Sequence, residues 1–524
     1  MRPYKGNWTA MILEQPDGCS PSDRPSDRSD EQQGEADGEG RPEQDEAALQ
    51  IGGKRSSQAL GEMERPFAAT TTDNAAAPPG SSIIRTALKI IRLGPICDSC
   101  LGRQFARLST GFTNQERGRT IKSFLAMAAD LAGIEGQSVL KDLAPSFRPA
   151  RLRLREEGED QSCWVCLGLM EPERLGKLAA SALNELERIE YGTFLVGTYM
   201  SGLLAENEEL LLADGGSGQA EPMKSELNRE VGKLIAARTG KAADLQSPDV
   251  VVHLNLAEGR AQLQINSLYI YGRYRKLQRG FPQTRWPCRA CGGAGCQRCG
   301  NSGRMYQESV DELIRDPIIE AARAEDTVFH GSGREDIDAL MLGSGRPFVV
   351  EAKKPYRRSL DYAALRDEIN RRAAGKVEVS DLTAADRALV EALKEAAYEK
   401  SYSAWIELAG PVEEEKLKSV LKELVGPVEQ RTPNRVSHRR ADKVRVRFIH
   451  DAELNEVRER SARITIRCDS GLYVKELVSG DGGRTKPSLA AALGMDARVV
   501  ELDVIDVGGV SNGQVTRDSH EYKV

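Results

Sequence analysis

The chain has 524 residues, of which 40% are hydrophobic, and a formal net charge of -6. This is more than one domain usually holds, so we expect at least two folded domains with packed cores. No apolar run approaches the about 18 residues of a membrane span, and no signal-peptide pattern opens the chain. These features exclude a membrane partner and predict a cytoplasmic protein.

Residues 1–80 form the first region of distinct composition, rich in Ser, Pro, Gly, Gln and acidic residues. Ten acidic residues and three arginines between positions 21 and 50 account for more than the whole net charge. Such a segment buries too little apolar surface to offset its ordering entropy, so we predict a disordered acidic low-complexity tail. The rest of the chain is near neutral, which permits nucleic-acid binding without requiring it.

Eight of the ten cysteines fall in four C-x-x-C pairs, a pattern that indicates metal binding in a reducing compartment. The first two pairs lie on either side of a predicted amphipathic helix at 114–132 and can close one tetrahedral site. The last two pairs are four residues apart, a spacing that can strain a second site, so metal binding there is left open. Four thiolates leave no position for water, so zinc would be structural. The proposed ligands are Cys97, Cys100, Cys163 and Cys166, then Cys288, Cys291, Cys296 and Cys299.

Between residues 175 and 281 the pattern alternates between helix and strand. The predicted strand at 262–274 ends in a mixture of tyrosines and cations that includes Arg273 and Arg275. Aromatic rings can stack on bases while neighbouring cations contact phosphates, so both arginines are RNA-binding candidates. A solvated strand edge accounts for the same residues.

The stretch from Gly333 to Phe348 reads G-R-E-D-I-D-A-L-M-L-G-S-G-R-P-F. Cations offset the desolvation of a buried carboxylate, so Asp336 and Asp338 can stay ionised beside Arg334 and Arg346. Such a carboxylate suits a nucleophile or a metal ligand. A polar turn with a salt bridge is the simpler alternative.

The segment from residue 431 to 447 is strongly basic, and its end alternates as a strand does. This alternation would place Lys443, Arg445 and Arg447 on one face, where they could contact phosphates. The solvent-facing side of an antiparallel sheet would look similar. The RNA-binding candidates of the C-terminal part are Arg439, Arg440, Lys443, Arg445, Arg447, Arg484 and Lys486.

Two chemistries compete for these residues. Asp338, Glu351 and Lys353 form a D…E-x-K set of the kind that metal-dependent nucleases use. Alternatively, Asp336 is a nucleophile without metal in an enzyme that breaks the glycosidic bond of uridine and rejoins the base through carbon. A lysine such as Lys475 would then assist the carboxylate, and tyrosines would hold the freed base. A catalytically inactive zinc-containing RNA-binding protein is the third hypothesis.

From about Cys97 to Val504 the chain resembles the THUMP-containing tRNA pseudouridine synthases of archaea and eukaryotes, the pseudouridine synthase ten family. The motifs in the N-terminal half are I-C-D-S-C-L-G-R-Q-F at 96–105, C-W-V-C-L-G at 163–168 and G-F-P-Q-T at 280–284. The C-terminal half adds the 333–348 stretch, T-P-N-R-V-S-H-R-R at 432–440, G-L-Y-V-K-E-L at 471–477 and G-D-G-G-R-T-K-P-S at 480–488. The motifs are long and follow the order of the family.

The resemblance implies an α+β protein with a zinc-containing THUMP-type RNA-binding domain at 81–284. A mixed α/β catalytic domain at 285–524 follows, built on a mostly antiparallel sheet with the cysteine-rich knuckle at its start. It also implies an enzyme that isomerises uridine 54, uridine 55 or both in the T arm of tRNA. We further expect a monomer without organic cofactor. Asp336 would be the nucleophile and Asp338 its rival in the same loop. The residues expected at the uridine are Arg334, Tyr402, Tyr473 and Lys475.

Overall fold

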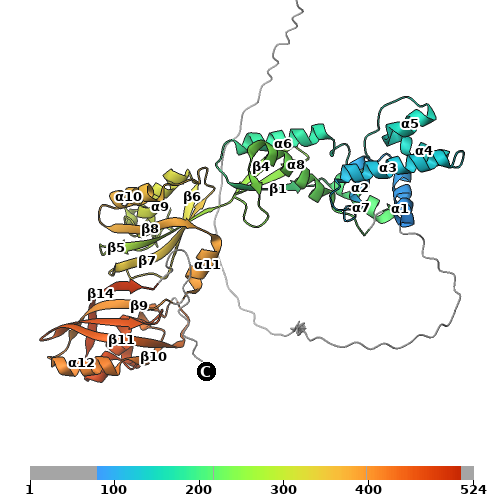
Figure 1. Ribbon diagram of the computed structural model, residues 1–524. Helices are drawn as coiled ribbons and strands as arrows, with labels where there is room; N and C mark the ends of the chain where they lie inside the picture. Colours follow the sequence, from blue (N-terminus) through green and yellow to red (C-terminus); the bar gives the residue numbers. More distant parts are fainter. Residues whose placement is uncertain (1–79, 216–217, 397, 439, 509–524) are drawn as a thin grey trace, which may run out of the picture. The chain divides into compact units, whose positions relative to one another are not determined.

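The computed structural model describes residues 80–215, 218–396, 398–438 and 440–508 (Figure 1). The acidic tail predicted for residues 1–80 lies outside them except for Gly80, and so does Arg439. Among the helices of the described ranges, none is both long enough and apolar enough to cross a bilayer.

The described chain begins with helices that surround the first two cysteine pairs. Thr113 and Glu116 form a capping box at the start of the long helix, as a T-x-x-E sequence favours. The helix preceding it packs closely, because a Cβ on Gly102 would lie only 1.8 Å from the carbonyl oxygen of Asn114. The long helix predicted at 114–132 is therefore confirmed. These elements are α1 (Gly80–Arg92), α2 (Asp98–Arg103), α3 (Asn114–Leu131), α4 (Gln137–Leu143), η1 (Ala144–Ser146) and α5 (Arg148–Leu154).

A four-stranded sheet with three helices follows, in the strand order β2-β1-β3-β4. Strand β1 is parallel to β2 and β3, and β4 runs antiparallel to β3. One hydrophobic core runs from Ala87 on α1 to Ala261 on β4, so the cysteine-containing helices and this sheet share buried surface. The elements are α6 (Pro172–Leu186), β1 (Thr193–Tyr199), α7 (Gly202–Gly215), α8 (Met223–Thr239), β2 (Ala242–Ala243), β3 (Val250–Asn255) and β4 (Arg260–Ile265).

The C-terminal half is built on a ten-stranded sheet, in the order β13-β10-β11-β12-β9-β14-β7-β5-β8 with β6 beside β7. Among its described strand pairs only β7 with β14 is parallel, which confirms the mostly antiparallel sheet. The strands are β5 (Leu268–Lys276), β6 (Asp326–Gly331), β7 (Leu340–Lys353), β8 (Val377–Ala385), β9 (Lys400–Leu408), β10 (Gly426–Arg431), β11 (Val444–Arg458), β12 (Ser461–Cys468), β13 (Thr485–Lys486) and β14 (Ala497–Val507).

Helices pack against this sheet in groups, which gives it two large cores and a smaller cluster of Tyr271, Val349, Val390 and Leu393 (Figure 1). One core lies among α9, α10 and strands β5, β7 and β8; the other lies among α12 to α14 and strands β9 to β12. Tyr402 on β9 packs against both cores, so it marks their junction. The helical elements are α9 (Val310–Ala322), α10 (Tyr362–Ala373), α11 (Arg387–Glu395), α12 (Glu414–Glu423), α13 (Val474–Ser479) and α14 (Leu489–Leu493), with short turns η2 (Gln297–Cys299), η3 (Asn434–Val436) and η4 (Gly480–Gly483).

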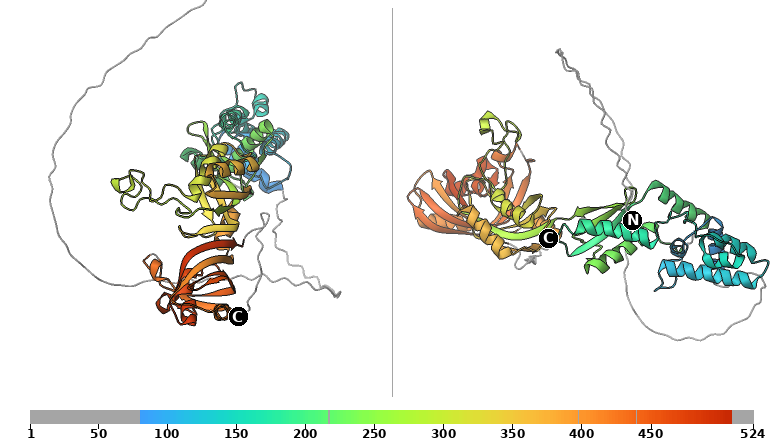
Figure 2. Two further views of the ribbon diagram at one scale, coloured as in Figure 1. Left: turned by 90° about the vertical axis from the view of Figure 1, so that its left-hand side faces the viewer. Right: turned by 90° about the horizontal axis from the view of Figure 1, so that it is seen from above.

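Strand β5 differs from the expected domain layout. Its residues 268–276 pair with β7 and β8, so they belong to the large sheet although they precede the boundary expected between residues 284 and 285. The run of alternating apolar residues predicts a strand, but it carries no information on which of two sheets that strand joins. The third and fourth cysteine pairs lie between β5 and α9, in a segment that protrudes from the elements around it (Figure 2).

Candidate active site

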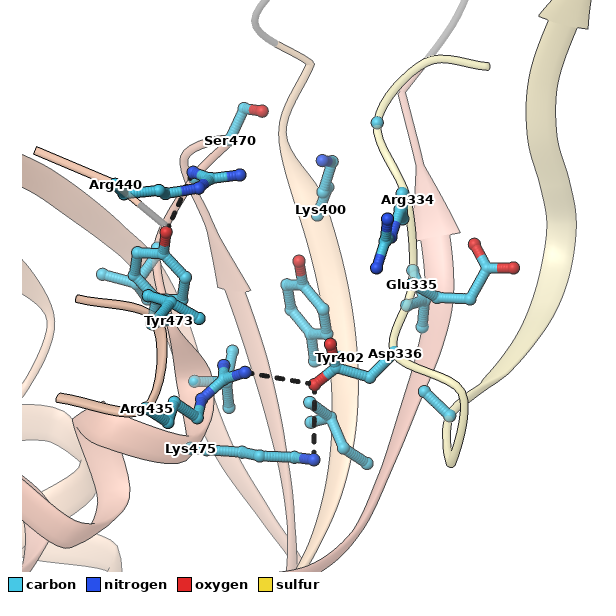
Figure 3. Close-up of a pocket in the computed structure, with 18 residues that line it drawn as sticks. Arg334, Glu335, Asp336, Lys400, Tyr402, Arg435, Arg440, Ser470, Tyr473 and Lys475 are labelled. Carbon is cyan, nitrogen blue, oxygen red and sulfur yellow. Dashed lines mark hydrogen bonds and ion pairs between the residues drawn. The ribbon is translucent and has the colours of Figure 1, made fainter. Parts of the chain in front are cut away.

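A cleft of about 480 Å³ opens on the large sheet, a volume typical of ligand pockets. Its walls come from five segments far apart in sequence, at 333–339, 400–402, 435–440, 470–475 and 502–504. The residues expected at the uridine, together with Asp336, all line this one cleft (Figure 3).

The carboxylate of Asp336 faces two cations across the cleft. Its Oδ2 lies 3.3 Å from Nζ of Lys475 and 3.8 Å from a terminal nitrogen of Arg435 (Figure 3). The side chain is 42% exposed, so it remains accessible to a ligand. Sequence reasoning proposed Lys475 at this place but did not single out Arg435, which lies within the T-P-N-R-V motif.

Asp338 lies in the same loop as Asp336 and also contacts Lys475, but its side chain has a different environment. Its side chain is 68% exposed, and it does not belong to the residues that line the cleft. Burial of the carboxyl raises its pKa, but the hydrogen bond and charge of Lys475 at 3.0 Å outweigh this and hold the pKa of Asp338 below its usual range.

Glu335, which lies between Arg334 and Asp336 in the sequence, has the buried carboxylate of the loop. Its side chain is fully buried and accepts hydrogen bonds from Nε of Arg346 at 2.9 Å and from the hydroxyl of Tyr274. The expectation that Arg346 accompanies an aspartate was therefore wrong: it pairs with Glu335. Arg334 instead stacks on the Trp286 ring at 5.1 Å.

Strands β5 and β7 hold the loop in place through a bulge in the G-S-G-R-P sequence. The register shifts between Tyr274 and Lys276, and Gly343 approaches β14 so closely that a Cβ would lie 1.8 Å from a carbonyl oxygen. Lys276 is fully buried and donates to the carbonyl of Ile337 at 2.9 Å, directly after Asp336. The bulge and the lysine thus fix the backbone that presents the carboxylate.

Arg273 is part of this support and not of the RNA-binding surface. It is 9% exposed, and its guanidinium donates to the carbonyl oxygens of Ser344, Gly345 and Val507. The expectation that Arg273 contacts RNA is therefore wrong, because its side chain is buried and its guanidinium donates hydrogen bonds to backbone carbonyls. Arg275, two residues further along β5, forms an ion pair with Glu378.

Two tyrosines occupy the middle of the cleft (Figure 3). Burial raises the pKa of Tyr402 well above its usual range, so it remains a neutral hydroxyl. Tyr473 precedes α13; its backbone N–H donates to the side chain of Gln430 at 2.7 Å. Its hydroxyl accepts a hydrogen bond from Arg440 at 3.0 Å, and Arg435 lies 5.7 Å from its ring centre.

The other RNA-binding candidates occupy the loops and strands beside the cleft. Arg445 and Arg447 alternate on one face of β11 and are half-buried, while Lys443 and Lys486 are exposed. Arg484 donates to the carbonyl of Thr432 at 2.7 Å and so connects two loops.

The carboxylates proposed for a nuclease do not come together. Asp338 precedes β7 and Glu351 lies near its far end, so about ten strand residues at about 3.3 Å each separate them. Glu351 contacts Ser267, His330 and Lys353 instead. The expectation that the set lies on adjoining strands was wrong, because Glu351 and Lys353 lie on β7 and Asp338 lies just before the start of the same strand.

Both cysteine sets form groups able to hold a metal ion. In each set all four sulfurs lie within 4.8 Å of one another. The sulfur separations include 3.7 Å between Cys97 and Cys166 and 4.0 Å between Cys288 and Cys296. A tetrahedral ion with metal–sulfur bonds of about 2.3 Å requires about 3.8 Å, so the donors fit such an ion. The short loop between the last two pairs is therefore compatible with one site.

Two family models match the chain: "Pus10 THUMP domain, archaeal" over residues 178–255 and "Pus10, C-terminal" over residues 269–508. A tRNA pseudouridine synthase Pus10 of Methanothrix thermoacetophila is 70% identical over 86% of this chain and 99% of its own length. The corresponding protein of Methanopyrus kandleri is 43% identical over 81% of this chain and 97% of its own. A solved Cbf5-Nop10-Gar1 complex matches 38% of this chain and 45% of its own at 21% identity and a TM-score of 0.25, from which we conclude nothing.

The two matched regions and the cleft on the large sheet define a THUMP-containing tRNA pseudouridine synthase, an isomerase that converts uridine to pseudouridine. Within that class, the chain belongs to the Pus10 family.

Proposed function

We propose that Asp336 is the nucleophile of the isomerisation and that the substrate is a uridine of the T arm of tRNA, at position 54, 55 or both. The carboxylate would attack C1′, and the bonding pair would leave with N1 of the base. After the base has turned, its C5 would bond to C1′, displace the carboxylate and lose its proton. The observation that carries this assignment is the position of Asp336 in the cleft, 3.3 Å from Lys475.

The residues around the carboxylate would share the remaining tasks. Tyr402 and Tyr473, from opposite walls, would hold the uracil ring while it turns. Lys475 and Arg435 would stabilise the aspartate whenever it leaves as a carboxylate. Arg334, which lines the cleft in the same loop as Asp336, would contact the nucleotide. The T arm is the region of tRNA that the family resemblance implies.

We also infer that both cysteine sets bind zinc as a structural ion, because four thiolates close the coordination shell. The ligands would be the eight cysteines named above. The two-domain division, the cytoplasmic location, the monomeric state and the RNA contacts of Arg440, Lys443, Arg445, Arg447, Arg484, Lys486 and Arg275 remain proposals. Sedimentation of the full chain at several concentrations tests the monomer.

The nucleophile is tested with Asp336→Asn, and Asp338→Asn is the matched control in the same loop. We expect Asp336→Asn to lower pseudouridine formation by at least about 10³-fold, as removal of a nucleophile does, while tRNA binding persists. Asp338→Asn should lower the rate by less than about 10-fold. Mapping pseudouridine in unmodified tRNA by mass spectrometry gives both the rate and the position. Normal turnover by Asp336→Asn would refute the assignment.

A further inference from the structure

Lys400 lines the cleft without an assigned role. It begins β9 two residues before Tyr402, so both side chains lie on the same face of the strand. In Figure 3 the Tyr402 ring lies between Lys400 and Lys475, so the two amines are at opposite ends of the cleft. The amine of Lys400 therefore faces a different part of a bound nucleotide from the part that meets Asp336.

The other cations of the cleft have partners, including Arg334 on the Trp286 ring, whereas Lys400 has none among the described residues. Lys475 pairs with Asp336, Arg435 with Glu476, and Arg440 with the Tyr473 hydroxyl. Within the described parts of the chain, Nζ of Lys400 makes neither an ion pair nor a hydrogen bond.

The surroundings of Lys400 add positive rather than negative charge. A Cβ built on Gly333 would lie 2.9 Å from Nζ of Lys400 and 3.3 Å from a terminal nitrogen of Arg346. The two cations thus face the same glycine, and the nearby carboxylate of Glu335 is already engaged by Arg346. Burial, reinforced by Arg346, lowers the pKa of Lys400 to about 8. This end of the cleft, among the described residues, lacks an anion free to pair with the amine.

The missing anion has a natural source in the substrate. Burying an ammonium group beside a guanidinium is unfavourable unless an anion compensates both. Uracil is neutral and cannot do so, but every nucleotide of the RNA carries a phosphodiester. Arg440 and the hydroxyl-bearing Ser470 lie at the same end of the cleft (Figure 3).

We propose that Lys400 binds a phosphodiester adjoining the target uridine and so sets how the flipped nucleotide enters the cleft. This role makes Lys400 a substrate-binding residue that is separate from the aspartate chemistry. The inference rests on the tRNA pseudouridine synthase activity of the family and not on the identity of the nucleophile.

The test combines lysine variants with a change in the RNA. Lys400→Met and Lys400→Arg are compared with Lys422→Met, which removes an exposed lysine of α12 and the same charge. We expect Lys400→Met to raise KM for unmodified tRNA at least about 10-fold with kcat within threefold, and Lys400→Arg to restore most of the loss. Lys422→Met should match the wild type. Circular dichroism melting should show no loss of fold, since Met fills the same space.

The second arm uses tRNA with one neutral methylphosphonate at either phosphate flanking the uridine that the wild type converts. One of the two substitutions should raise KM of the wild type by about the same factor as Lys400→Met, and should add little to the loss in Lys400→Met itself. Equal losses in the two enzymes from both substitutions would overturn the proposal. A fall in kcat with unchanged KM would also overturn it and would assign Lys400 to proton transfer. The position that the wild type converts is mapped first, so both outcomes can be read without knowing whether Asp336 is the nucleophile.

Discussion

Three acidic residues that are close together in the sequence lie in very different environments. Glu335 is buried and bound to Arg346 and Tyr274, Asp336 faces the cleft, and Asp338 is largely exposed. The buried pair anchors the loop, so that the neighbouring carboxylate is presented in a fixed place. For the proposed nucleophile, Glu335 would then be a positioning residue that acts through the backbone of Asp336.

Loss of the charge at Glu335 should therefore destabilise the fold. Glu335→Gln leaves the Arg346 guanidinium buried without its counter-ion, and we expect a loss of about 3 kcal/mol in the free energy of unfolding. Urea unfolding measures it. The control is Glu407→Gln, whose partner Arg498 is 75% exposed, and which should cost less than about 1 kcal/mol. Equal costs for the two variants would contradict a buried anchor.

Because the pKa of Lys400 is lowered, we expect the proposed phosphodiester contact to depend on pH. The amine is protonated below pH about 8 and neutral above it, so KM of the wild type should rise as the pH increases through this value. Arginine stays charged over this range, so Lys400→Arg should show a flatter KM profile. The groups facing the amine are Arg346 from β7, Glu335 from the loop and Cys468 from β12. Parallel profiles in steady-state assays would argue against a charged contact.

At the scale of elements, strand β11 joins the second core to the entrance of the cleft. Its residues Arg445 and Arg447 share a face with the buried Ile449, so their stems pack on the sheet while the charged heads reach its end. The opposite face of this part of the strand carries Val444 and Val446, both exposed. The cations therefore form a line that a phosphate backbone could follow.

Replacing Lys443, Arg445 and Arg447 by Ala should weaken tRNA binding without slowing the chemical step. We expect KM to rise and the slope of log binding constant against log salt to fall by about 0.7 to 0.9 for each phosphate that the variant no longer neutralises. Lys416→Ala with Lys422→Ala on α12 removes exposed cations elsewhere and should leave the slope unchanged. A fall in kcat alone would show that this face does not bind phosphates.

Sequence patterns predicted some of these features and missed others, for physical reasons. The C-x-x-C pairs reflect local chemistry, and both cysteine groups are present. The mostly antiparallel sheet, which is also present, was implied by the family resemblance and not by a local pattern. The partner of Arg346 depends on the bulge in β7, which moves the guanidinium toward Glu335 and is visible only in the strand register. Arg273 looked like a surface cation because its burial is set by β14, which lies far later in the sequence.

At the scale of the whole molecule, the two cysteine groups lie in regions of different size. Cys100, Cys163 and Cys166 belong to the core shared by α1–α8 and β1–β4, whereas of the second set Cys288 alone is buried. Removal of metal from the first set should thus expose a core, and removal from the second should disturb a protruding segment.

We expect two zinc ions per chain by metal analysis. Cys100→Ser should lose one ion and melt the helices of the N-terminal half, while Cys299→Ser should lose one ion and retain most of the helical circular dichroism. The matched control is Cys468→Ser, a buried cysteine outside both groups, which should keep both ions. A single ion in the wild type would contradict a second site.

The cleft lies on strands β9 and β14, which are hydrogen-bonded side by side, and on the loop before β7. A floor of hydrogen-bonded strands favours a cleft of fixed width, so we expect one nucleotide to leave its stack to reach Asp336. The free-energy cost of unstacking would then depend on the RNA and not on a rearrangement of the protein. Selection among uridines would follow how readily each one is extruded, and rigidly paired positions would be poor substrates even where their sequence is identical.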